Sequence, residues 1–282
     1  MTESFPTRVG VIGGGRMGLG IAHGFCLRGA HVVVVERDDR ASAAAQERFA
    51  GLLDTSVQRG DLDDAGPALE RSTMAVGLDA LAGCDLVIEA VPEDVDLKVE
   101  TLTAAEKVLG DDAWLATNTS SLSVDDLAGH LTRPERFCGL HFFNPVPASK
   151  LIEIVVGERT DPALVELAKG WTETLKKTPV VVTDSPGFAS SRLGVAIALE
   201  AMRMVEEGVA SAADIDAAME LGYKHPAGPL KTTDIVGLDV RLGIAEYLAS
   251  TLGERFEPPQ ILRDKVARGE LGRKSGTGFY DW

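Results

Sequence analysis

Short apolar runs alternate with longer segments of helical periodicity over roughly the first two-thirds of the chain. The apolar runs are rich in β-branched residues, as in strands that are buried on both faces of a parallel sheet. We predict strands at residues 8–12, 31–36, 85–89, 114–117, 137–142, 151–156 and 179–183. Helices are predicted between several of them, at residues 17–28, 41–59 and 162–177. Alternation of this kind favours a largely parallel, doubly wound sheet.

The pattern changes after the break at Asp184-Ser185-Pro186-Gly187, beyond which only helical periodicity is found, at residues 188–207, 211–221 and 233–252. Each of these segments is followed by glycine, which is common just after a helix. Ser211 and Asp214 have the spacing of a helix N-cap pair. We therefore predict an α/β protein, with a Rossmann-type doubly wound, mostly parallel sheet over residues 1–184. An all-helical domain over residues 185–282 is expected to cover the substrate and to form a homodimer contact.

The composition is that of an ordinary globular protein with a large core, and 45% of its 282 residues are hydrophobic. A formal net charge of −15 argues against nucleic acid or an anionic membrane as the main partner. Any anionic ligand must then be held by local dipoles and a few placed cations. The absence of a long apolar run and of a signal-peptide pattern predicts a cytoplasmic protein. The widely spaced Cys26, Cys84 and Cys138 predict buried, reduced thiols, with neither a disulfide nor a metal site.

A glycine loop, Gly13-Gly14-Gly15-Arg16-Met17-Gly18, directly follows the first predicted strand and opens the first predicted helix. In this context Gly13 permits a tight turn, Gly15 lets the backbone approach a pyrophosphate, and Gly18 allows close packing of helix on strand. The phosphates would meet the positive end of the helix dipole. The loop therefore predicts a dinucleotide site.

Glu36 ends the second predicted strand, about twenty residues after the loop. A carboxylate here accepts hydrogen bonds from the adenosine ribose hydroxyls and would repel a 2′-phosphate, which favours NAD over NADP. Arg37 follows and could contact such a phosphate. The alternative interpretation is a solvated pair of Glu36 and Arg37 at the strand end.

His141 and Glu153 lie on neighbouring predicted strands, and Glu153 interrupts a run that is otherwise apolar. A buried carboxylate without a partner would be costly. If the two strands pair, Glu153 can accept a hydrogen bond from one ring nitrogen of His141 while the other nitrogen faces substrate, which makes a general base. The other four histidines stand in contexts that favour structural or solvated roles.

Polar side chains of residues 117–122, among them Asn118 and Ser120, follow the fourth predicted strand. Ligands of open α/β sheets bind at the carboxyl ends of strands, so these groups could reach a substrate. The alternative is that a serine here caps a helix at residues 124–128.

Segments spread over nearly the whole chain resemble, in the expected order, the L-3-hydroxyacyl-CoA dehydrogenases, and most of all the bacterial 3-hydroxybutyryl-CoA dehydrogenases. They are residues 13–20, 89–93 with Lys98, 118–122, 141–145, 184–192 and 272–280. The resemblance implies reversible, NAD-dependent oxidation of a 3-hydroxyacyl-CoA to the 3-oxoacyl-CoA.

The resemblance also implies roles for individual residues. His141 is similar to the catalytic base, Glu153 to its orienting partner and Ser120 to a serine that hydrogen-bonds the substrate oxygen. Further resemblances place Glu93 and Lys98 at the nicotinamide-side ribose, and Asn118 and Lys274 with the cofactor. Apart from the resemblance, Lys98 and Lys274 would be interpreted as solvated surface charges.

One position departs from the family pattern, because Ser191 stands where an asparagine is usual. A hydroxyl cannot present an amide NH₂ and a carbonyl together, so a water-mediated site or a shifted substrate preference is expected. Arg59 is a weak candidate for a coenzyme A contact. The alternatives are a dehydrogenase of another 3-hydroxy acid or acyl-carrier thioester, and a non-catalytic NAD-binding protein.

Overall fold

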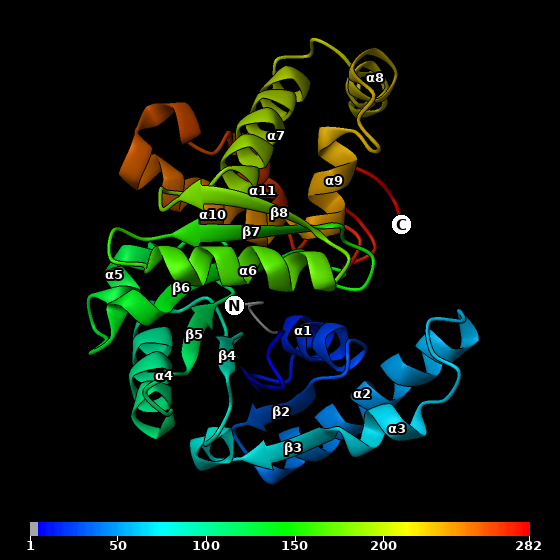
Figure 1. Ribbon diagram of the computed structural model, residues 1–282. Coiled ribbons are helices and arrows are strands. Elements are labelled where there is room, and N and C mark those ends of the chain that lie inside the picture. The colour runs from blue at the N-terminus through cyan, green and yellow to red at the C-terminus, as the bar shows by residue number, and fades with distance from the viewer. Residues whose placement is uncertain (1–4) are drawn as a thin grey trace. The chain divides into compact units, whose positions relative to one another are not determined.

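The computed structural model describes residues 5–282 and divides the chain into two compact units, Met1–Asp184 and Ser185–Trp282. The first unit contains an eight-stranded sheet in the order β3-β2-β1-β4-β5-β6-β7-β8 (Figure 1). Every neighbouring pair is parallel except β6 and β7, which are antiparallel. The strands are β1 Arg8–Ile12, β2 His31–Glu36, β3 Ser72–Val76, β4 Leu86–Glu89, β5 Trp114–Thr117, β6 Phe137–Phe142, β7 Leu151–Val156 and β8 Thr178–Thr183.

Helices of the first unit connect these strands and bury them. The helices are α1 Arg16–Cys26, α2 Asp39–Gln58, α3 Gly66–Glu70, α4 Val95–Val108, α5 Val124–Ala128 and α6 Pro162–Thr174, with 3₁₀ turns at Leu78–Leu81 and Pro134–Arg136. The four consecutive valines of β2 are all buried, because both faces of its sheet are covered. One apolar core joins the central strands to α1, α2 and α6.

The strand order reverses between the paired strands β1 and β4, because the strands that follow β1 in the chain lie on one side of this pair and those that follow β4 lie on the other. Ligands of open α/β sheets bind in the crevice at such a switch point, outside the carboxyl ends of the strands. The glycine loop leaves β1 here, and a Cβ on Gly13 (φ 99°) would lie 2.8 Å from the Ala90 carbonyl oxygen that follows β4. The fold therefore brings the glycine loop and the segment after Glu89 together.

The second unit consists of helices around a separate apolar core. They are α7 Ser190–Glu206, α8 Ala212–Ala217, a π-helical turn Ala218–Gly222, α9 Pro229–Val236, α10 Leu238–Leu252, a 3₁₀ turn Glu254–Phe256 and α11 Gln260–Ala267. Ser211 caps α8 by accepting a hydrogen bond from the Asp214 amide at 3.2 Å, as its spacing predicts. Across residues 5–282, none of the helices combines the length and the apolar character that crossing a bilayer requires.

The structure confirms the predicted fold class and each predicted strand to within one residue at its ends. The prediction of one helix over residues 233–252 is wrong, because Gly237 adopts a φ of 110° and separates α9 from α10. The pattern missed β3, a half-exposed edge strand with little apolar alternation, and it also missed α4 and α11.

Candidate active site

His141 and Glu153 face each other across the antiparallel pair β6 and β7, in direct register. Nδ1 of His141 lies 2.8 Å from Oε2 of Glu153, which confirms the predicted contact. Only 6% of His141 and 1% of Glu153 is exposed. When Nδ1–H donates to the carboxylate, Nε2 is the ring nitrogen that can accept a proton.

Asn118 ties the end of β5 to the end of β6. The side-chain Oδ1 of Asn118 accepts a hydrogen bond of 2.9 Å from the backbone amide of Phe142. The backbone N–H of Asn118 donates to the Glu89 carbonyl at 2.8 Å. Phe142 follows His141 directly, and the ring of Phe143 lies 4.3 Å from the imidazole, centroid to centroid. Asn118 therefore fixes the strand end that carries His141.

The hydroxyl-rich turn after Asn118 is organised around Glu93. Oε1 of Glu93 accepts hydrogen bonds from the hydroxyls of Thr119 (2.6 Å), Ser120 (3.3 Å) and Ser121 (3.2 Å). Although burial opposes ionisation, the Lys98 ammonium and the Thr119 and Ser120 donors hold the pKa of the Glu93 carboxyl below its ordinary value. The capping interpretation fits a different serine, since Ser123 is the residue that caps α5.

Lys98 is 1% exposed, so the interpretation of this residue as a solvated surface charge is wrong. Its Nζ lies 2.7 Å from Oε1 of Glu89 and 3.3 Å from Oε2 of Glu93. Glu89 is fully buried, and its Oε2 accepts a hydrogen bond of 2.6 Å from the Thr117 hydroxyl. A buried ion pair requires such satisfied neighbours, because taking both charges out of water is expensive.

Glu89 and Thr117 complete this cluster, and no motif in the sequence predicted a role for either. A signal was present, because a carboxylate that ends an apolar strand needs a partner, which is the argument that singled out Glu153. The partner itself could not be found by that argument, since Lys98 lies on α4, a helix that the pattern missed.

The glycine loop has the geometry that a pyrophosphate requires. A Cβ on Gly18 would lie 1.8 Å from the Gly13 carbonyl oxygen, so only glycine permits this packing of α1 on the loop. A Cβ on Gly15 would meet no atom of the described residues within 4 Å, which leaves this side of the loop open. No side chain among residues 5–282 caps the N-terminus of α1, so its amides are available to an anion.

Glu36 is the last residue of β2, and its side chain is hydrogen-bonded to the glycine loop. Its Oε1 accepts a hydrogen bond of 2.9 Å from the Gly14 amide, while the Arg48 guanidinium donates to the Gly14 carbonyl at 3.0 Å. Arg37 points its guanidinium to Asp38, at 3.0 Å, so the alternative of a Glu36–Arg37 ion pair does not describe this strand end. The carboxylate of Glu36 is thus placed where an adenosine ribose would approach, and the residues fit NAD.

Replacing Glu36 by alanine is expected to weaken discrimination against NADPH, because the carboxylate no longer repels a 2′-phosphate. We expect the ratio of kcat/KM for NADPH to that for NADH to rise roughly tenfold, which corresponds to about 1.4 kcal/mol. Initial rates with both cofactors provide the measurement. Asp39→Ala, which removes an exposed carboxylate nearby, is the matched control, and a ratio unchanged in Glu36→Ala would contradict the role of Glu36.

Ser191 and Lys274 belong to the second unit. Ser191 lies in the first turn of α7, and Nζ of Lys274 lies 2.6 Å from the Asp239 carboxylate, with part of the lysine exposed. The tail that carries Lys274 is fixed by the buried Asp234, whose carboxylate accepts hydrogen bonds of 2.9 Å from the amides of Phe279 and Tyr280.

The three cysteines are buried, as predicted, and burial raises the pKa of the Cys138 thiol to about 12. Among the described residues, no group of three or more histidine, cysteine, aspartate or glutamate side chains is arranged to hold a metal ion.

Comparison with known protein families decides what these features belong to. The chain matches the NAD binding domain of 3-hydroxyacyl-CoA dehydrogenase over residues 8–185, and the C-terminal domain of the same enzyme over residues 187–282. The chain belongs to the 3-hydroxyacyl-CoA dehydrogenase family. It is therefore an NAD-dependent oxidoreductase, and the resemblance of its motifs to this family is confirmed.

Three relatives match this chain over almost their full length. A 3-hydroxybutyryl-CoA dehydrogenase of Bradyrhizobium diazoefficiens is 39% identical over 98% of this chain and 95% of the relative. The (S)-3-hydroxybutyryl-CoA dehydrogenase PaaH1 of Ralstonia eutropha has the same fold, with a TM-score of 0.93, 37% identity, and coverage of 98% of this chain and 99% of that one. FadB2 of Mycobacterium tuberculosis gives a TM-score of 0.94 at 38% identity, over 99% and 100% of the two chains.

Proposed function

We propose that the protein oxidises a short-chain 3-hydroxyacyl-CoA, similar to 3-hydroxybutyryl-CoA, reversibly to the 3-oxoacyl-CoA. The observation that carries the proposal is the buried hydrogen bond between His141 and Glu153, at the strand ends of an NAD-binding sheet. The relatives named for 3-hydroxybutyryl-CoA support the short acyl chain. NAD, when bound, supplies the acceptor of the hydride that leaves C3 of the substrate.

In this proposal His141 takes the proton of the C3 hydroxyl on Nε2, and returns a proton to the C3 oxygen in the reducing direction. Glu153 orients the imidazole and stabilises the imidazolium that forms, as a buried carboxylate does for a catalytic histidine. The hydroxyl of Ser120 positions the C3 oxygen, with Ser191 or Asn144 as a second polar contact. Ser120 would exchange its hydrogen bond with Glu93 for one with substrate.

The remaining polar residues are proposed to hold the cofactor. Gly13, Gly15 and Gly18 shape the loop for the pyrophosphate, and Glu36 binds the adenosine ribose. Glu93 and Lys98 contact the nicotinamide-side ribose through the cluster that they form with Glu89, and Asn118 and Lys274 complete the cofactor contacts. We assign cofactor binding to residues 1–184 and substrate cover and dimerisation to residues 185–282.

Loss of NADH absorbance with acetoacetyl-CoA tests the proposed reaction directly. We expect turnover with acetoacetyl-CoA and slower turnover as the acyl chain lengthens. A folded protein that binds NADH but turns over none of a series of 3-oxoacyl-CoA substrates would rule out the reaction. A panel that adds acyl-carrier thioesters and free 3-hydroxy acids separates the CoA substrate from the alternatives, and complete inactivity would leave the non-catalytic NAD-binding protein.

Coenzyme A carries several phosphates, so its site needs positive charge. Arg59 and Arg16 line a cavity of about 260 Å³ together with Asn144 and the residues that follow it. Asn144 comes soon after His141 along the chain, which supports Arg59 and Arg16 as contacts for coenzyme A.

We also propose that the protein is a cytoplasmic homodimer. The second unit exposes several large apolar side chains, including Leu193, Val209, Leu221 and Tyr223. Apolar surface of this kind often marks a contact between subunits. The three buried cysteines fit a reducing compartment.

A further inference from the structure

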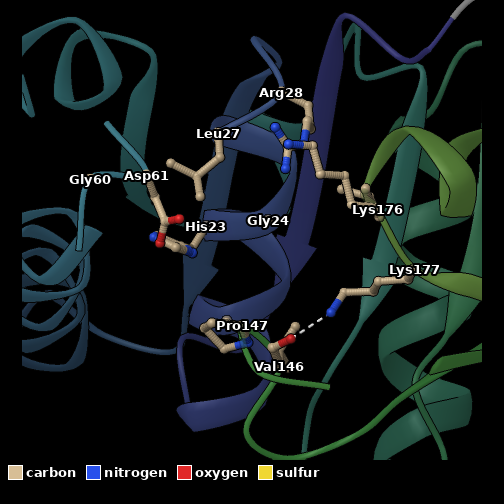
Figure 2. A pocket seen from close by; sticks show the side chains of 12 residues that line it. His23, Gly24, Leu27, Arg28, Gly60, Asp61, Val146, Pro147, Lys176 and Lys177 are labelled. Atoms are coloured by element: carbon tan, nitrogen blue, oxygen red, sulfur yellow. Dashed lines mark hydrogen bonds between the residues drawn. The ribbon is translucent and has the colours of Figure 1, made fainter. Parts of the chain in front are cut away.

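A second cavity, also of about 260 Å³, lies beside α1 (Figure 2). Its walls come from α1, the turn at Gly60 and Asp61, the loop at Val146 and Pro147, and the turn at Lys176 and Lys177. It shares lining residues, among them His23, Asp61 and Val146, with the cavity that contains Arg59. The two cavities therefore adjoin, and a long ligand could extend from one into the other.

The floor of this cavity is open because Gly24 has no side chain. A Cβ on Gly24 would meet only the tip of Leu175, at an ordinary 3.7 Å, so packing does not require glycine here. At Gly20, one turn earlier, a Cβ would lie 2.8 Å from Cβ of Val146, and packing does require glycine. Glycine inside a helix is destabilising relative to alanine. At Gly24 the gain is an exposed stretch of helix backbone on which a flat ring could lie.

Two cations at the rim of the cavity are available to a ligand. Figure 2 shows the side chains of Arg28 and Lys176 extending toward each other above Gly24. Among the described residues, neither of these two side chains has an ion-pair partner. Lys176 has a φ of 58°, a left-handed conformation that a lysine rarely adopts. Strain of this kind is often retained where a side chain is used.

The third cation, Lys177, has a structural role. Its Nζ donates to the Val146 carbonyl at 2.6 Å and to the Ser149 carbonyl, as the dashed line to Val146 in Figure 2 indicates. Burial lowers the pKa of the Lys177 ammonium. Lys177 thus fixes the loop that forms one wall and leaves Arg28 and Lys176 as the charges that face solvent.

The opposite wall is formed by Asp61 and His23, which lie side by side in Figure 2. Nε2 of His23 lies 2.8 Å from the Ser56 hydroxyl, and burial lowers the pKa of the ring although Asp61 opposes this shift. His23 is therefore uncharged at neutral pH. Asp61 presents a carboxylate that can accept hydrogen bonds from an amino group, such as the exocyclic amine of adenine.

We propose that this cavity receives the nucleotide end of coenzyme A, with phosphate oxygens at Arg28 and Lys176 and the adenine on the backbone at Gly24. The inference rests on the proposed function and names the part of the acyl-CoA that this cavity binds. A polyanion is repelled by a chain of net charge −15, so it needs local cations such as these. In this proposal the pantetheine arm occupies the adjoining cavity, which is lined by Asn144, three residues after His141 in the chain.

The test compares two thioesters, acetoacetyl-CoA and acetoacetyl-pantetheine, which differ by the nucleotide end alone. In the double variant Arg28→Ala with Lys176→Gly, we expect KM for acetoacetyl-CoA to rise roughly tenfold, as the loss of two partly exposed charge contacts predicts. The values of kcat, and of kcat/KM for acetoacetyl-pantetheine, should remain those of the wild type. Glycine suits the left-handed backbone at position 176, so the variant should fold normally.

Lys107→Ala, which removes one exposed positive charge on α4, is the control and should leave KM and kcat for both thioesters unchanged. A double variant that keeps the wild-type ratio of kcat/KM for the two thioesters, or that loses both activities equally, would overturn the cavity assignment. Calorimetric titration with coenzyme A alone separates this inference from the proposed reaction. Weaker binding of coenzyme A to the double variant than to the wild type supports the cavity even if no thioester is turned over, and equal binding refutes it.

Discussion

His141→Gln is expected to lower kcat for acetoacetyl-CoA reduction about 10³-fold, in the range that general acid–base catalysis contributes. Glutamine can keep a hydrogen bond to Glu153 but cannot carry a proton to or from the C3 oxygen. Since the glycine loop and Glu36 are unchanged, the dissociation constant for NADH should stay within about twofold of the wild type, a difference of about 0.4 kcal/mol. Stopped-flow absorbance gives kcat, and NADH fluorescence gives the affinity.

The variant His130→Gln is the matched control, because His130 is exposed and lies on a loop of the same unit. It should keep wild-type kcat. Glu153→Gln provides the complementary measurement: if Glu153 orients and stabilises the imidazolium, its loss should lower kcat strongly with little change in NADH affinity. Wild-type turnover in His141→Gln would exclude this histidine as the base.

Lys98→Met is expected to destabilise the protein by about 3–5 kcal/mol, because it leaves the fully buried carboxylate of Glu89 without its cation. Glu93 loses the same cation, at 3.3 Å, so the turn with Thr119 and Ser120 is also affected. The thermal unfolding midpoint should fall by roughly 10 °C, measured by circular dichroism. NADH binding should weaken as well, since this cluster lies beside the glycine loop.

Lys107→Met is the control on the same helix, where the lysine is exposed and the midpoint should change by less than about 2 °C. Combining Lys98→Met with Glu89→Gln should recover much of the lost stability, because the buried negative charge is then removed together with its partner. If Lys98→Met unfolds at the wild-type midpoint, the buried ion pair does not stabilise the sheet edge as we infer.

The parallel sheet could be predicted because its central strands are mostly apolar and buried. The glycine loop could be predicted because the turn at Gly13 and the helix packing at Gly18 exclude a side chain. The partner of His141 could be predicted for a similar reason, since a carboxylate in an apolar strand demands one. Edge strand β3 and helix α4 lack such strong patterns, so they were missed. The break at Gly237 was missed because a helical pattern continues on both sides of it.

The sequence by itself predicted a dinucleotide loop, an acid that favours NAD and a histidine with a carboxylate partner, because each leaves a local pattern. The reaction type came from the resemblance of its motifs to the family. Only the tertiary structure decided which charges are buried and which cavities exist. Lys98 is an ordinary lysine in the sequence, and it becomes the cation of a buried cluster because the sheet brings the ends of β4 and β5 together. Likewise, the cavity beside Gly24 is lined by segments that lie far apart in the chain. A local sequence pattern cannot predict that such segments come together.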